Sequence, residues 1–437
     1  MYQIKDKESI LDNILERWEL TKSKSSPDSL PLRESTMEVF KTLGLPGKKD
    51  EAYKYTPITK TLEKTFSFRE ENPKVALSSE QIEKHFVPGL SGNVFVFVNG
   101  IYSEEHSSII SSKDQLEVRS IDDFYADGLE AITNEKNLLV PEDPFKALNT
   151  ALTESGVYVR VPAGKIVEQP IIIYYLTDTT NGKVIQHTKN VVLVEENSQV
   201  NIVECHLGTG EHPDFTNSST IILMKEHAVA THHKIENENN ASIHIDNTIV
   251  HVAAKSTFSS FTISLSGKLI RNNLNISLNG ENSEANMDGL YVIKGDQLVD
   301  NETTVDHKVP NCLSNELYKG IIDGKATGVF NGKIFVRPDA QKTNAFQSNK
   351  TILLSDDATI NTKPQLEIWA DDVKCSHGAT TGQIDEEQLF YLRSRGLGKE
   401  TARGILLHAF ALDILDKIKL PALKDYLDNL ITDRLQN

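Results

Sequence analysis

Short β-rich runs follow one another from Asn93 to about Ala370, and this succession restricts the possible folds more than any other feature of the chain. The clearest runs are residues 94–98, 157–161, 171–176, 191–194, 200–203, 221–224, 243–245, 261–265, 274–278, 334–336 and 366–370. Only residues 144–152 interrupt them with a helical spacing of apolar side chains. A doubly wound α/β fold would need a helix after each strand, and a β-sandwich rarely continues for so long as one domain.

Asparagine, aspartate and glycine separate the β-rich runs. The pairs Asn272-Asn273, Asn279-Gly280, Asp323-Gly324 and Asn331-Gly332 are all expected to form turns. Hydrophobic residues make up only 38% of the chain, which suits a narrow core better than a large compact one. We therefore predict a mainly β protein with a parallel β-helix core, in which stacked coils lie ~4.8 Å apart. The spacing of the runs is too irregular to assign the length of one coil.

Helical patterns lie at both ends of the chain. Apolar side chains recur with helical spacing from Lys7 to about Leu20, a loop is expected over residues 22–31, and a second helix ends near Gly44. Helical spacing returns after Asp385, a residue that can cap the first helix of this segment. The chain therefore divides into a helical region at 1–90, a β-helix core at 91–384 and a helical domain at 385–437.

The charge balance excludes several classes of partner. Lys and Arg number 46 against 62 Asp and Glu, a net charge of −16, which disfavours binding to nucleic acid or to anionic membranes. The three cysteines, Cys205, Cys312 and Cys375, are too few and too far apart for a disulfide framework. No apolar run approaches the ~18 residues of a membrane helix, and the first residues lack an export signal. We expect a soluble, cytoplasmic protein.

Common catalytic motifs are missing from the sequence. It has no G-x-x-x-x-G-K-[ST] loop, no G-x-S-x-G, no H-E-x-x-H and no C-x-x-C. We therefore expect a subunit without catalytic activity of its own, and nucleotide hydrolysis, where it is needed, in a partner.

Three sets of candidate residues are more simply explained as structural. His232 and His233 are adjacent, so on a strand they point to opposite faces and cannot easily bind one ion, and we expect them at the surface or at corners. Cys205 is expected to be a small buried residue of a strand. The dispersed aspartates, including Asp300, are expected at solvated corners. On a β-helix such carboxylates also occur in calcium-dependent, glycan-cleaving enzymes, which is the alternative function.

The segment from Val373 to Thr380 contains the strongest candidate for a metal site. If it continues the preceding strand, Cys375 and His377 project to the same side, while Lys374 and Ser376 face the other way. A thiolate and an imidazole suit zinc, iron or an iron–sulfur cluster. Two ligands leave the site incomplete, so a second subunit would have to supply others. A purely structural role for the pair stays open.

The sequence also resembles a known family. Residues 371–396, DDVKCSHGATTGQIDEEQLFYLRSRG, closely resemble the signature of the SufB/SufD family of iron–sulfur cluster assembly scaffolds. Residues 43–56, 145–149, 299–310 and 339–350 add to this likeness, which covers most of the chain. Gly378 and Gly382 resemble the SufD branch, and the small number of cysteines is similar to that of a subunit that does not accept sulfur.

This resemblance implies a right-handed parallel β-helix, a SufB-like sister subunit at its last coils, and a SufC-like ATPase docked on residues 385–437. His377 matches a family histidine that helps to hold the nascent iron–sulfur cluster opposite a cysteine of the sister, and Cys375 is a weaker candidate ligand. The resemblance leaves open whether the isolated chain forms a homodimer and whether a flavin binds the complex. A glycan-active enzyme and a purely structural interaction module are the alternatives.

Overall fold

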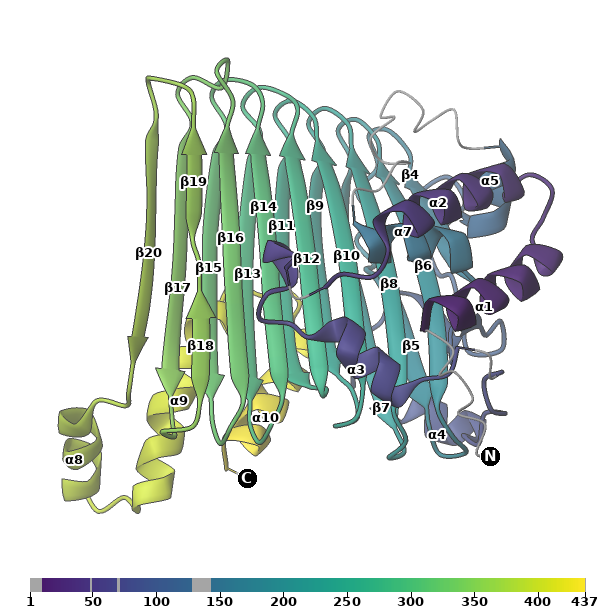
Figure 1. The fold of residues 1–437 in the computed structure, drawn as a ribbon. Helices are drawn as coiled ribbons and strands as arrows, with labels where there is room; N and C mark the ends of the chain where they lie inside the picture. The colour runs from purple at the N-terminus through teal and green to yellow at the C-terminus, as the bar shows by residue number, and fades with distance from the viewer. Residues whose placement is uncertain (1–9, 48, 69–70, 128–142, 437) are drawn as a thin grey trace.

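The computed structural model describes residues 10–47, 49–68, 71–127 and 143–436. Two long sheets face each other along the molecule and together form a parallel β-helix (Figure 1). Helices lie before and after it in the chain, so the predicted fold, mainly β with a parallel β-helix between helical ends, is confirmed. Within the described ranges, no helix is both long and apolar enough to cross a membrane.

The strands alternate between the two sheets along the chain. In spatial order the first sheet contains β2 (Ile101–Tyr102), β1 (Asn93–Val98), β5 (Ile171–Asp178), β7 (Gln199–Thr209), β9 (Val229–Asn237), β11 (Thr257–Ser266), β13 (Glu284–Ile293), β15 (Leu313–Ile322), β17 (Asn344–Leu353) and β20 (Lys374–Gly382). The second contains β18 (Thr359–Thr362) with β19 (Gln365–Ile368) beside it, β16 (Thr327–Val336), β14 (Leu298–His307), β12 (Leu269–Leu278), β10 (Ile243–Val252), β8 (Asp214–Met224), β6 (Val184–Val194), β4 (Val157–Val161) and β3 (Glu117–Ser120). The β1–β2 and β3–β4 pairs are antiparallel, and the other neighbouring strands are parallel.

Successive coils differ in length, which explains why no period is visible in the sequence. Thr257 pairs with Glu284 in one pair of neighbouring coils, and Ile171 pairs with Ile202 in another. More residues separate the two members of the second pair, so the coil between them is longer. One corner of the coil is nevertheless repeated, because a residue with left-handed backbone stands at it in successive coils. These residues are Asn197, His227, Lys255, Asn282, Asn311 and Lys342. The longer and shorter coils therefore share this tight corner between the second sheet and the first.

Two of the four predicted turns lie inside strands. Asn279-Gly280 and Asp323-Gly324 are outside the strands, as expected, but Asn272-Asn273 lies in the middle of β12 and Asn331-Gly332 in the middle of β16. The prediction was wrong at these two pairs because their amides find partners within the sheets. The Asn272 side chain donates to a Glu236 carboxylate oxygen at 3.0 Å, and the Asn331 side chain to Glu302 at 2.9 Å.

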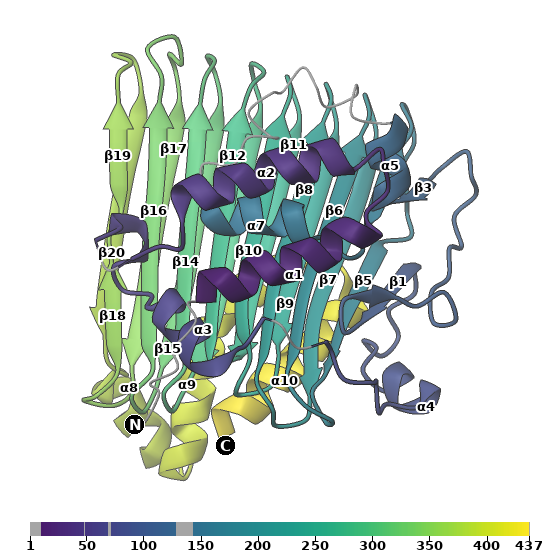
Figure 2. The ribbon, with the colours of Figure 1, turned by 45° about the vertical axis from the view of Figure 1, so that its right-hand side comes forward.

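Helices cover the outer faces of both sheets (Figure 2). The helices of the described residues are α1 (Ile10–Lys24), α2 (Leu30–Leu43), a 3₁₀ turn (Glu51–Tyr53), α3 (Ile58–Thr65), α4 (Ser79–Glu83), α5 (Ile121–Asp127), α7 (Pro144–Leu152), α8 (Glu386–Ser394), α9 (Lys399–Leu415) and α10 (Pro421–Gln436). Trp18, Phe40 and Phe145 of α1, α2 and α7 share a buried cluster with Phe215 of the second sheet. The first loop is shorter than predicted, and the expected helix start at Lys7 lies outside the described residues.

The C-terminal helices α9 and α10 cover the first sheet. Their apolar side chains, such as Leu407 and Leu427, share a cluster with Cys205 and Ile235. Cys205 is fully buried in β7, as predicted. Both faces of this sheet are therefore shielded from water over its central strands.

The expected surface positions of His232 and His233 were wrong, because both side chains are only 2% exposed. The two residues do point to opposite faces of β9. His232 turns inward, where its Nε2 lies 3.0 Å from a Glu204 carboxylate oxygen. The ring of His233 stacks on Phe261 of the covered outer face, with ring centroids 5.1 Å apart. The helices outside the sheet explain this burial.

The interior between the sheets has an apolar half and a polar half. Valine and isoleucine fill the apolar half, as Val192, Ile222 and Val250 do on three neighbouring strands of the second sheet. The polar half holds buried ionisable, amide and hydroxyl side chains on β6 to β12. These include Asn190, Glu204, His206, Ser218, Thr220, His232, Lys234, Glu236, His244, Asp246, Thr248, Ser264 and Asn272.

Two tyrosines in the interior depend on glycines of the neighbouring coil. Gly289 pairs with Tyr318, and Tyr291 pairs with Gly320. A Cβ atom added at either glycine would overlap the facing ring. Both tyrosine side chains are about 1% exposed, so neither ring has room to move aside.

We expect Gly289→Ala to lower the free energy of unfolding by about 1–3 kcal/mol, because the methyl group overpacks the core against Tyr318. Denaturant titration of the purified chain measures the change. Gly404→Ala in α9 is the matched control, because a methyl group there meets open space, and it should raise stability by about 0.5–1 kcal/mol. Equal stability of Gly289→Ala and the parent chain would contradict the interlocked packing.

Candidate metal site at the open end of the β-helix

The last strand of the first sheet, β20, has a partner on one side only. It pairs with β17 in parallel register, and among the described strands none pairs with its other edge. Every residue of β20 except Cys375 is exposed, and Cys375 is half-buried. Figure 1 shows β20 at the end of the coil stack, with no helix lying over that end. The β-helix therefore ends in an open face with free backbone groups on its edge strand.

Cys375 and His377 stand on the same face of β20. Cys375 pairs with Ala345 and His377 with Gln347, and both partners are buried residues of the interior. Cys375 packs against the apolar cluster that contains Ala345 and Val336. His377, two residues on, lies at the exposed rim of the interior. The strand therefore presents one thiol and one imidazole toward the space that a further coil would occupy.

The thiol and the imidazole differ in their surroundings. Partial burial raises the pKa of the Cys375 thiol, although a hydrogen bond to the backbone of Ala345 opposes the shift. Cys375 is therefore a neutral thiol near neutral pH, and the thiolate is the form that binds metal. His377 is exposed, and an imidazole binds metal through a neutral ring nitrogen. His377 is thus the better placed of the two candidate ligands.

A buried carboxyl group lies in the same interior column as His377, where a column is a row of inward side chains that pair from one coil to the next. Glu316 of β15 pairs with Gln347 of β17, which in turn pairs with His377. The Gln347 side-chain amide donates to Glu316 Oε2 at 2.7 Å. Gly332 of the facing sheet has no side chain, which leaves room for the Gln347 amide. Burial raises the pKa of Glu316 to about 7, since hydrogen bonds from Thr303 and Gln347 only partly offset the desolvation.

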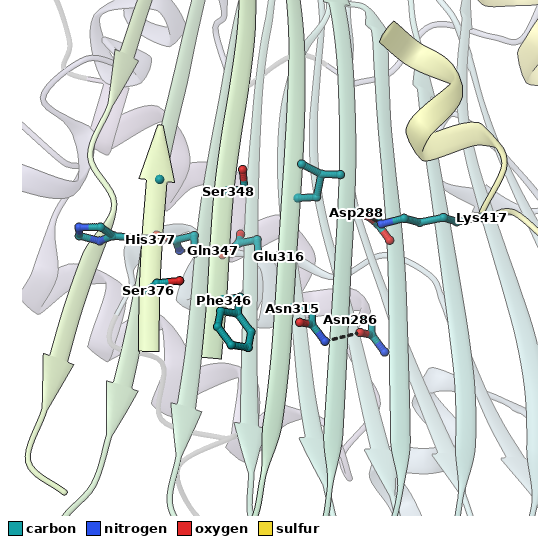
Figure 3. Close-up of a pocket in the computed structure, with 12 residues that line it drawn as sticks. Asn286, Asp288, Asn315, Glu316, Phe346, Gln347, Ser348, Ser376, His377 and Lys417 are labelled. Atoms are coloured by element: carbon teal, nitrogen blue, oxygen red, sulfur yellow. Dashed lines mark hydrogen bonds and ion pairs between the residues drawn. The ribbon is translucent and has the colours of Figure 1, made fainter. Parts of the chain in front are cut away.

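A pocket of about 390 Å³ lies on the other face of the same strands. Asn286, Asp288 and Phe346 line it, with Lys417 from the segment after α9 forming an ion pair to Asp288 at 2.5 Å. Figure 3 shows the His377 imidazole and the Ser376 hydroxyl on opposite sides of β20. Glu316, Gln347 and His377 also border the pocket. The His377 imidazole itself points to the side of β20 opposite the Ser376 hydroxyl (Figure 3).

The two ligands remain a pair within this chain. In the described parts of the structure, no third His, Cys, Asp or Glu joins Cys375 and His377 in a group able to hold a metal ion. Two protein ligands are fewer than the three or four of a zinc or iron site. Any metal or cluster held here needs ligands from outside the chain, at the open face.

Among the described residues, the dispersed aspartates form no group of three or more ligands that could hold a metal ion such as calcium. Asp300, expected at a solvated corner, is instead 1% exposed and forms an ion pair with Arg271. The guanidinium of Arg271 lies over the ring of Tyr53, 4.1 Å from its centroid. Asp300 is therefore a structural contact between the second sheet and the N-terminal region.

The sequence analysis did not predict that Glu316 and Gln347 are neighbours of His377. Gln347 lies one coil before His377 and Glu316 two coils before it, so only the coil length connects the three positions. Because the coils differ in length, simple repetition does not align these residues. Residues 344–350 read NAFQSNK, with two adjacent apolar residues followed by four polar ones, so no local alternation marked Gln347 as an inward residue.

The raised pKa of Glu316 predicts a pH-dependent stability. The unfolded chain loses this proton near its ordinary pKa of 4.5, whereas the folded chain keeps it until the pH approaches about 7, so the protein loses stability between these values as the pH rises. Glu316→Gln removes this loss. Relative to the parent chain, the free energy of unfolding of the variant should rise by on the order of 2–3 kcal/mol from about pH 5 to about pH 8. Urea titrations at the two pH values measure it, and a pH-independent difference would contradict the shift.

Comparison with known proteins agrees with these features. The family description "SUF system FeS cluster assembly, SufBD core domain" matches residues 175–410, and "SufBD protein N-terminal region" matches residues 5–173. The chain is 33% identical to an iron–sulfur cluster assembly SufBD family protein of Synechocystis, over 92% of this chain and 90% of that protein. It is 29% identical to the iron–sulfur cluster assembly protein SufD of Escherichia coli, over 97% of each chain. This chain therefore belongs to the SufBD family of iron–sulfur cluster assembly proteins and is SufD-like.

Proposed function

We propose that this chain is a scaffold subunit that helps to hold a nascent iron–sulfur cluster at an interface with a SufB-like sister subunit. The observation that carries the proposal is the incomplete pair of ligands, Cys375 and His377, on the unpaired edge strand of an open β-helix end. A sister subunit that covers this end would satisfy the edge strand and supply the missing ligands together. The cluster is cargo in this role, and the chain is a scaffold without catalytic activity of its own.

Apolar side chains near the open end fit a protein partner. Phe346, Ile368 and Trp369 are 44%, 39% and 49% exposed, and all three lie in the last coils. Aromatic and aliphatic side chains of this kind form the centres of protein interfaces. The same face would also accept a second copy of this chain, so a homodimer of the isolated subunit is part of the proposal. The three free thiols suit a cytoplasmic, reducing setting.

The docking surface proposed for the SufC-like ATPase is helix α8. It projects from the β-helix and contacts α9, and its residues Phe390 and Tyr391 are 73% and 56% exposed (Figure 1). Asp385 caps its N-terminus by accepting hydrogen bonds from the backbone of Glu387 and Gln388. In contrast, α9 and α10 are committed to covering the first sheet. Ile405 of α9 is also 45% exposed, but within residues 385–437 the most exposed large apolar side chains, Phe390 and Tyr391, belong to α8.

His377→Ala tests the cluster-holding role. In a complex co-expressed with the sister subunit and the ATPase, we expect the variant to assemble but to carry at least about tenfold less cluster, because a ligand is removed. Anaerobic absorption spectroscopy and iron and sulfide analysis measure the loading.

His212→Ala is the matched control, because His212 is an exposed histidine in the turn before β8, far along the chain from the open end. It should load as the parent complex does. Full loading of the His377→Ala complex at the parent rate would overturn the role of His377. If the Cys375→Ser complex carries as much cluster as the parent complex, His377 is the only ligand that this chain contributes.

Replacing Phe390 and Tyr391 together by alanine tests the docking surface. We expect the affinity for the ATPase to fall at least about tenfold, because aromatic side chains often contribute most of the binding energy of a protein interface. The melting temperature of the variant should equal that of the parent chain. Titration calorimetry with the purified ATPase measures binding. The control replaces Ile109 and Ile110, which are 47% and 54% exposed in the N-terminal part, and should bind normally. Unchanged binding by the α8 variant would contradict docking on α8.

A further inference from the structure

A second group of metal-binding side chains lies inside the β-helix, on strands β7 and β10. One ligand atom each of His206, His244 and Asp246 lies within 4.8 Å of those of the other two. All three side chains are at most 1% exposed. In the part of the chain that the structure describes, this is the one group of three or more such ligands. It lies several coils away from the pair on β20.

His206 has buried nitrogens that no protein group satisfies. Neither its Nδ1 nor its Nε2 atom has a hydrogen-bond partner, although both are shielded from solvent. Its ring stacks on Tyr175, with centroids 4.6 Å apart, and lies 4.4 Å from the ring of His244. An imidazole always carries at least one N–H group, and leaving its nitrogens unpaired in the interior is unfavourable. A metal ion bound to one of them would satisfy that atom.

His244 is held by a carboxylate on the side away from Asp246. Its Nδ1 atom lies 3.2 Å from Glu238 Oε2, and its Nε2 atom lies 2.8 Å from the hydroxyl of Ser218. The same hydroxyl donates to Asp246 Oδ1 at 2.8 Å. Histidines that bind metal commonly have a carboxylate on their other ring nitrogen, which fixes the ring. The Ser218 hydroxyl thus bridges two of the three ligand atoms and can turn aside for an ion or remain as a weak ligand.

The charges around the group favour a cation. Lys234 donates to Asp246 Oδ2, and Oδ1 is the oxygen that shares the Ser218 hydroxyl with His244 Nε2. Three further carboxylates are buried in the same region: those of Glu204, Glu236 and Glu238. Oxygen Oε1 of Glu236 has no hydrogen-bond partner and lies 4.0 Å from His244 Nδ1. Besides Lys234, the ion-pair partners of these carboxylates are histidines, His232 at Glu204 and His244 at Glu238. A divalent ion would add positive charge beside this group of buried carboxylates.

We propose that His206, His244 and Asp246 bind a divalent first-row transition-metal ion inside the β-helix. Two imidazoles and one carboxylate are the ligands that Zn²⁺ and Fe²⁺ take when further positions are left to water or to a hydroxyl. The Ser218 hydroxyl stands at such a position. This site is separate from the cluster-holding pair at the open end and does not depend on it.

His187 provides a matched control within the same β-helix. It is fully buried on β6, and both of its ring nitrogens also lack hydrogen-bond partners. Its ring packs against Phe215, with centroids 6.0 Å apart, and it belongs to no group of metal ligands in the described residues. Loss of metal on changing His206 but not His187 would therefore report ligation and not the mere loss of a buried imidazole.

The test uses Co²⁺ as the probe, supplied during expression so that the ion is present as the coils close. The full-length chain also carries His377→Ala, which removes the open-end ligand. We expect one equivalent of Co²⁺ to survive desalting, with visible absorption bands of a nitrogen- and oxygen-ligated ion. His206→Gln should weaken Co²⁺ binding at least about tenfold, and His187→Gln should bind as the parent does.

Two results would overturn the proposal: no cobalt retained by the parent chain, or equal retention by His206→Gln. Circular dichroism shows whether His206→Gln is folded. If it is not, anomalous scattering from crystals of the cobalt-loaded parent decides. A peak between His206, His244 and Asp246 supports the site, and its absence or a peak elsewhere overturns it.

Discussion

The parallel register of stacked coils is the constraint on which the rest of this structure depends. Because each strand pairs in register with the strand one coil away, every inward side chain has fixed neighbours above and below it. Tyr318 fits because Gly289 stands in the next coil, and Gln347 reaches Glu316 for the same reason. Insertions between coils are absorbed at corners and do not shift these columns. Packing, burial and the position of His377 all follow from this register.

The outer faces of the two sheets and the last coil of the stack are covered to different degrees. The N-terminal helices cover the outer face of the second sheet, and α9 and α10 cover that of the first. The last coil, in contrast, keeps the unpaired edge of β20. Unpaired edge strands invite association, and proteins normally block them when no partner exists. The absence of such blocking among the described residues, together with the candidate ligands Cys375 and His377 on that strand, supports the proposed interface with a sister subunit.

Much of the fold could be predicted because it depends on local patterns. Alternation in residues 157–161 and the apolar run at 171–176 were enough to place β4 and β5, and Pro144 to Leu152 forms the predicted helix. The positions that were missed depend on contacts between coils. Asn272 lies within a strand because Glu236 accepts its hydrogen bond, and Asp300 is buried because Arg271 pairs with it. Local propensity contains no information about either partner. Residues that lie inside strands were therefore predicted at turns and corners.

The polar half of the interior is better explained by ligand binding than by stability. Ile171, Ile202 and His232 occupy equivalent inward positions in three successive coils. The position that holds His232 in one coil therefore holds isoleucine in the two coils before it. Buried ion pairs seldom stabilise a fold more than apolar residues of similar volume, because desolvation offsets their attraction. Lys234 with Asp246 and His232 with Glu204 therefore add little that isoleucine or valine could not provide. Where a fold retains buried charges and an unsatisfied imidazole beside them, the arrangement indicates a site that is complete only when its ligand is bound.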